Sequence, residues 1–215
     1  MSQKPEFTIT KKTVTIDKEL CINTKVADVE FNSQVDAIAN LIETHSKDGS
    51  DRLTKTPVFK AMLEAMADAL EEWEECKQSV LNSVKVEEGM QINNWKLDYE
   101  TCQLQFDLMQ KPEVNTVPYA VNEELCHRVQ EIHKMCDAIT AVVNDIISMH
   151  VEDSSSGIVK SPVFKGFMKL KAHYLSEFSD AKVAVQKACL DPALIERNPS
   201  WSLDYKTKTL TVEAV

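Results

Sequence analysis

Apolar residues recur every three or four positions over residues 125–150, which places them along one stripe of a helix of about seven turns. The members of this stripe are Leu125, Val129, Ile132, Cys136, Ile139, Val143, Ile146 and His150. A less regular version occurs earlier in the chain, at Phe31, Val35, Ile38, Leu41, Ile42 and His45. The pattern predicts two long helices that end near His45 and His150.

A second long helix follows each of these, and its start is marked by a hydroxyl residue before a proline. Thr56-Pro57 and Ser161-Pro162 combine a helix-capping side chain with a proline at the first helical position, where its missing N–H costs nothing. Apolar residues continue at helical spacing, from Phe59 to Val84 and again from Phe164 to Cys189. Because only short polar segments precede them, we predict two antiparallel helical hairpins.

Alternating apolar and polar positions predict a strand pair after each helical hairpin. Trp95 and Leu97 point to one side of a strand, residues 98–101 form the turn, and Cys102, Leu104, Phe106 and Leu108 alternate back. Trp201, Leu203, Leu210 and Val212 repeat these positions. The tryptophans are therefore expected to pack against the core.

Weaker strand patterns precede the helices. Residues 7–10 and 13–16 alternate as a strand pair would, with its turn at Lys11-Lys12. Residues 114–121 retain this pattern only in part, and Pro118 favours the edge of a sheet or a loop.

The chain repeats itself. Lys55-Thr-Pro-Val-Phe-Lys60 returns as Lys160-Ser-Pro-Val-Phe-Lys165, and the Trp95 hairpin returns at Trp201, with all matches 105 to 107 positions apart. We predict a first repeat unit at residues 1–109 and a second at 110–215, together an α+β fold. In this tandem duplication each unit is a long antiparallel helical hairpin covered by a small antiparallel β-sheet, and the two units form an intramolecular pseudo-dimer.

Composition limits the class of protein. The net charge of −10 disfavours general nucleic-acid binding, and no apolar run is long enough to span a membrane. Among six cysteines only Cys21 and Cys126 occupy equivalent positions, so free thiols are favoured over disulfides and a cytoplasmic location is expected.

Residues with metal-binding or acid–base chemistry gather in the first helix of each unit. Cys126, His127, His133 and Cys136 do not fit a tetrahedral zinc site on one helix, because His127 points about 100° away from the others. We expect neither a bound metal nor a cofactor. His45 and His150 occupy equivalent positions and are minority candidates for acid–base groups. Interaction with the end of a helix is the favoured role for both.

The two second helices differ in charge. Residues 57–84 carry two lysines and six acidic residues, a sum of −4, whereas residues 162–189 carry five lysines and two acidic residues, a sum of +3. Drift of two solvated faces explains this as readily as a binding role does. The candidate partner-binding residues are Glu64, Asp68, Glu71, Glu72, Glu75, Lys165, Lys169 and Lys171, with Tyr99 and Tyr205 as exposed turn residues.

Catalytic motifs such as glycine-rich phosphate loops and serine elbows do not occur in the sequence. We therefore predict a non-enzymatic protein–protein interaction module: an adaptor, inhibitor or assembly factor. Its partner would be another protein, or a second copy bound through the acidic and basic helices. The alternatives are a small enzyme or metal protein using His45 and His150, and a nucleic-acid-associated regulator using the basic second unit.

Overall fold

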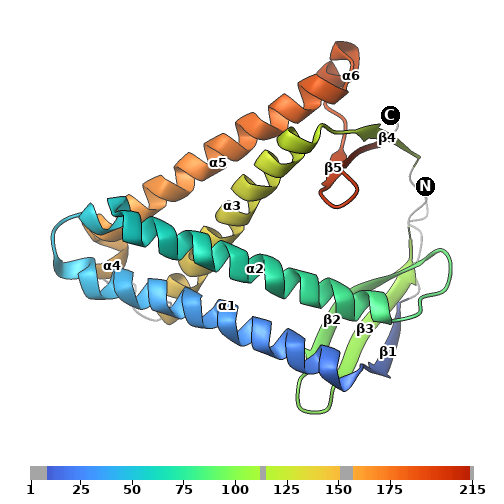
Figure 1. Ribbon diagram of the computed structural model, residues 1–215, viewed down its shortest axis with the longest axis horizontal. Coiled ribbons are helices and arrows are strands. Elements are labelled where there is room, and N and C mark those ends of the chain that lie inside the picture. The colour runs from blue at the N-terminus through green and yellow to red at the C-terminus, as the bar shows by residue number, and fades with distance from the viewer. Residues whose placement is uncertain (1–8, 112–114, 151–156, 214–215) are drawn as a thin grey trace, which may run out of the picture. The chain divides into compact units, whose positions relative to one another are not determined.

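The structure, a computed structural model, describes residues 9–111, 115–150 and 157–213. Long helices and two small sheets account for most of it, which confirms the predicted α+β class (Figure 1). The helices and 3₁₀ turns are α1 (Lys18–Thr44), η1 (His45–Lys47), η2 (Arg52–Lys55), α2 (Pro57–Ser83), α3 (Glu123–Met149), α4 (Gly157–Lys160), α5 (Pro162–Cys189) and α6 (Pro192–Glu196). The strands are β1 (Thr10–Thr15), β2 (Met90–Asp98), β3 (Gln103–Gln110), β4 (Thr116–Ala120), β5 (Trp201–Asp204) and β6 (Thr209–Glu213).

The chain divides into two compact units, one made of residues 1–31 and 71–113 and the other of residues 32–70 and 114–215. They do not coincide with the predicted repeat units, because α1 and α2 each contribute one half to both. The boundaries 1–109 and 110–215 describe repeated sequence rather than compactness, and they stay a prediction.

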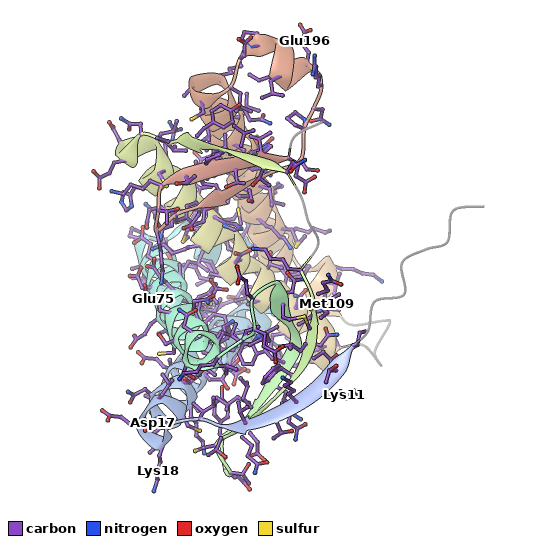
Figure 2. All side chains as sticks on the ribbon, turned by 90° about the vertical axis from the view of Figure 1, so that its right-hand side faces the viewer. Lys11, Asp17, Lys18, Glu75, Met109 and Glu196 are labelled. Carbon is purple, nitrogen blue, oxygen red and sulfur yellow. The ribbon has the colours of Figure 1, made fainter. Side chains whose placement is uncertain are left out.

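The first compact unit is an antiparallel sheet of order β1-β3-β2 that packs against the start of α1 and the end of α2 (Figure 1). Figure 2 labels Lys11 on β1 and Met109 on β3 of this sheet. The apolar face of the sheet and one face of each helix enclose the core. Its buried members are Ile16, Cys21, Val80, Leu97, Leu104, Phe106 and Leu108.

The second compact unit contains an antiparallel sheet of order β4-β6-β5 and the lengthwise packed helices α3 and α5. The core beneath its sheet consists of Val121, Cys126, Val129, Ala181, Val185, Leu190, Leu210 and Val212. Farther along the helices, the rings of Phe59 on α2 and Phe167 on α5 meet edge to face at 5.9 Å. Beside Phe167, α5 comes so close to η2 that Gly166 has no room for a side chain.

The same local geometry recurs in both units. Cys21 and Cys126, Val80 and Val185, and Leu104 and Leu210 are buried pairs at a spacing of 105 or 106 residues. The Ile16 N–H donates to Cys102 O at 2.9 Å, and the Val121 N–H donates to Lys208 O at 2.9 Å. Equivalent positions of the repeated sequence thus have similar surroundings in the two units, and the tandem duplication itself stays a prediction.

The predicted helix starts are confirmed. The Thr56 hydroxyl accepts a hydrogen bond from the Phe59 N–H at 3.2 Å, and the Ser161 hydroxyl accepts one from the Phe164 N–H at 3.2 Å. Each hydroxyl thus satisfies an N–H that has no partner within its helix.

Two of the strand predictions need correction. Lys11 and Lys12 do not form a turn, because β1 continues through them and pairs with β3 from Thr10 to Thr15. Exposed lysines suit this position, since β1 is an edge strand. The predicted first strand of that pair lies largely outside the described residues. Pro118, by contrast, lies in edge strand β4 as expected.

Trp95 is half-buried rather than fully in the core, because β2 changes register between Asn93 and Lys96 and breaks the alternation. Asn94 in this bulge has a left-handed backbone with φ of 46°. Trp201 is also half-buried against the second core.

Candidate interaction surfaces

Tyr99 and Tyr205 are half-buried rather than exposed as predicted. Each lies in a turn that begins with an aspartate whose side chain accepts two backbone hydrogen bonds. Asp98 accepts them from the N–H groups of residues 100 and 101, and Asp204 accepts them from the N–H groups of residues 206 and 207. The carbonyl of each tyrosine lies 3.9 Å from a buried thiol, Cys21 or Cys126. Each turn is thereby fixed against the first helix of its repeat.

The Tyr205 side chain forms a polar contact with α3. Its hydroxyl lies 3.0 Å from Nδ1 of His133, whose Nε2 lies 3.4 Å from a carboxylate oxygen of Asp137. The His133 ring stacks on Phe178 with 4.7 Å between centroids. In the first unit Asp28 stands at the position equivalent to His133, and it hydrogen bonds to Tyr99. A tyrosine that contacts a polar residue of the helix is therefore common to both units.

The chemistry of this contact favours a structural role. Burial raises the pKa of Tyr205 to about 12, and the neighbouring Cys126 and Asp137 act in the same direction. At pH 7 such a phenol is protonated by about 10⁵ to 1, so it is not an activated nucleophile. Burial and then Asp28 raise the pKa of Tyr99 to about 12 as well.

The two equivalent histidines each have a carboxylate neighbour, which the sequence motifs did not indicate. His45 begins η1 and its Nδ1 contacts a carboxylate oxygen of Asp48. His150 caps the end of α3, and its Nε2 lies 4.0 Å from Oε1 of Glu43. The His150 backbone N–H bonds to the Ile147 carbonyl at 3.1 Å, which agrees with a role at the helix end. Participation of either histidine in acid–base chemistry stays a prediction.

The cysteine and histidine residues weighed as metal ligands have separate surroundings. Cys126 and Cys136 are buried, His127 faces Glu131 at 3.9 Å, and His133 contacts Tyr205. Over residues 9–111, 115–150 and 157–213, no group of three or more histidine, cysteine, aspartate or glutamate side chains is placed to hold a metal ion.

The oppositely charged helices contribute mainly exposed side chains. Glu64 and Asp68 lie in the half of α2 that belongs to the second compact unit. Glu64 pairs with Lys60 at 3.4 Å, and Asp68 lies 4.0 Å from Lys134. Both acidic residues line a shallow pocket of 210 Å³ with Glu131 and Tyr174. In the half of α2 that belongs to the first compact unit, Glu72 and Glu75 are exposed, whereas Glu71 is half-buried.

On α5, Lys165 and Lys169 are exposed and Lys171 is half-buried. Lys169 lies close enough to Asp51 to help lower the pKa of that carboxyl, although the hydrogen bond from Lys55 is the main cause. These acidic and basic residues stay predictions as partner-binding groups.

A surface that sequence reasoning missed lies on the first half of α1. Ile22, Val26 and Val29 are 49%, 59% and 57% exposed, although α1 already buries its opposite face through Cys21, Ala27 and Phe31. We call Ile22, Val26 and Val29 the α1 stripe. Spacings of four and three residues place its members on one side of the helix.

The second repeat has polar residues in place of the three aliphatic residues of the α1 stripe. Residues 105 positions later on α3 are His127, Glu131 and Lys134, and the last two form an ion pair at 2.7 Å. An apolar surface at these positions is therefore not required by the fold. The sequence does indicate the α1 stripe when the two copies are compared, because polar residues at the equivalent positions show that this helical face need not be buried.

No helix among the described residues is both long enough and apolar enough to cross a membrane. No protein-family model, no curated protein and no solved structure matches this chain, so the interpretation of its function depends on its own residues.

Proposed function

We propose that this chain is a non-enzymatic protein–protein interaction module, an adaptor, inhibitor or assembly factor that acts in the cytoplasm. The observation that carries the proposal is the α1 stripe, three aliphatic side chains that are each about half exposed on one helical face. Contiguous exposed apolar side chains on a helix are typical of surfaces that bind another protein. Isolated exposed apolar residues, in contrast, need no partner.

The charges around the stripe suit protein binding. Lys18 and Lys25 flank it on one side and Glu30 on the other, so an apolar centre is bordered by polar groups (Figure 2 labels Lys18 at the start of α1). The six free thiols favour a reducing compartment and support the cytoplasmic location.

The test is capture from extracts of the native cells with three forms of the protein. One is the wild type, one carries Ile22→Gln, Val26→Gln and Val29→Gln, and the control carries Leu175→Gln on α5. Leu175 is a matched control because it is 46% exposed, close to the 49% of Ile22. The wild type and the control are expected to retain a common bound protein that the triple variant loses. The same proteins bound to all three forms would contradict the proposal.

A further inference from the structure

The α1 stripe has the register of a short coiled-coil seam. Spacings of four and then three residues between Ile22, Val26 and Val29 correspond to alternating d and a positions of a heptad. In that register Lys18 and Lys25 occupy g positions and Glu30 an e position, so cations border one side of the seam and an anion the other.

The flanking charges are available for a partner. Lys25 and Glu30 are both exposed, and neither belongs to an ion pair within the described part of the chain. Both side chains can therefore meet opposite charges of a partner.

Charge complementarity selects both the partner and its direction. When two copies of α1 lie parallel along this seam, each g residue faces the e residue five positions ahead on the other helix. Lys25 then faces Glu30 of the second copy, and the twofold symmetry makes this contact twice. An antiparallel arrangement would bring Lys25 against Lys25 and Glu30 against Glu30, which is unfavourable.

We propose that the α1 stripe binds the α1 stripe of a second copy of this chain, with the two helices parallel. The inference rests on the proposed function, since it names the partner of the same surface. It differs from association of the acidic and basic helices, because it places the contact on α1 and leaves α2 and α5 outside it.

The seam is short, with three apolar residues on each helix, so the dimer should be weak and concentration-dependent. Sedimentation velocity of the full chain over a wide range of concentrations should therefore show a reversible monomer–dimer equilibrium. Val26→Gln places an amide in the centre of the seam and should weaken the dimer at least tenfold.

Charge reversal tests the parallel arrangement. Lys25→Glu and Glu30→Lys should each weaken the dimer several-fold, because each brings like charges together. An equimolar mixture of the two variants should restore dimerisation, and so should the double variant within one chain. Lys47→Glu on η1 has the same charge change at an exposed position outside α1, α2 and α5, and it should leave the equilibrium unaltered.

Several results would overturn the proposal. Single charge reversals that dimerise as well as the wild type would exclude the parallel seam. Loss of dimer in the Lys47→Glu control would show a general effect of net charge. A wild type that stays monomeric at all concentrations excludes self-association. If the triple glutamine variant still loses a captured protein in that case, the proposed function holds with a different partner. Circular dichroism of every variant establishes that it is folded.

Discussion

The close approach of η2 to α5 makes Gly166 a sensitive position in the second unit. A β-carbon added to Gly166 would lie 2.8 Å from Cβ of Asp51 and 2.8 Å from Oγ1 of Thr54. Since Asp51 Cβ is next to the main chain, rotation of a side chain cannot relieve the contact, and η2 must move away from α5.

The expected size of the effect follows from two opposing contributions. Alanine favours a helix over glycine by about 1 kcal/mol. Overpacking costs about 1–3 kcal/mol, and two contacts this short place the cost at about 2 kcal/mol. Gly166→Ala should therefore lower the free energy of unfolding by about 1 kcal/mol and the thermal midpoint by about 2–4 °C.

Urea denaturation followed by circular dichroism measures this change, with Gly157→Ala as the matched control. A β-carbon at Gly157 meets nothing within 4 Å, so that variant should be at least as stable as the wild type. If Gly166→Ala were as stable as Gly157→Ala, the packing of η2 on α5 described here would be wrong.

Three further predictions concern the polar groups. Tyr205→Phe removes the 3.0 Å contact with His133 and should cost about 1 kcal/mol in thermal unfolding, whereas Tyr119→Phe, at a hydroxyl without a hydrogen bond in the described structure, should cost nothing. An equal loss in both would remove the assigned role of Tyr205. Burial, and then Asp36, raises the pKa of Asp145 above 3.8, so its stabilising contribution is present below pH 3.8 and is lost as pH rises through the folded pKa. Asp145→Asn should therefore be more stable than the wild type at pH 7, and the gain should shrink as the pH falls toward 3; a gain independent of pH would contradict this. Hydrogen bonds from backbone N–H groups hold the pKa of the Asp98 and Asp204 carboxyls below 3.8. The N–H of Glu100 has the largest effect on Asp98, and the N–H of Thr207 has the largest effect on Asp204. The stabilisation by both carboxylates is therefore present above pH 3.8 and is lost as the pH falls through the folded pKa. Asp98→Ala and Asp204→Ala should each lower the thermal midpoint at pH 7 by more than at pH 2, and equal deficits at the two pH values would show that the carboxylate charge is irrelevant.

The helices were predictable because their signals are local. Apolar spacing and the Thr56 and Ser161 caps depend on residues within a few positions, and the structure agrees with them. The turn at Lys11-Lys12 was wrong because pairing with β3, almost one hundred residues away, extended the strand through both lysines. Short-range alternation contains no information about such a partner.

The candidate site was less predictable for a related reason. The contact of Tyr205 with His133 joins a β-turn to a helix 72 residues earlier, and neither residue type requires the other. The α1 stripe has the spacing of a core face, so periodicity alone assigns it to the interior. Only the polar residues His127, Glu131 and Lys134 at the equivalent positions indicate that this face need not be buried.

Binding through the α1 stripe is tested most directly by hydroxyl-radical footprinting of its three side chains. Oxidation of Ile22, Val26 and Val29 is compared between dilute purified protein and protein in native-cell extract, with Leu175 as the internal reference. We predict strong oxidation of all four residues in the dilute protein, and protection of the α1 stripe but not of Leu175 in the extract, because a bound partner covers that face of α1. Equal oxidation of the stripe under the two conditions would contradict its role as a binding surface.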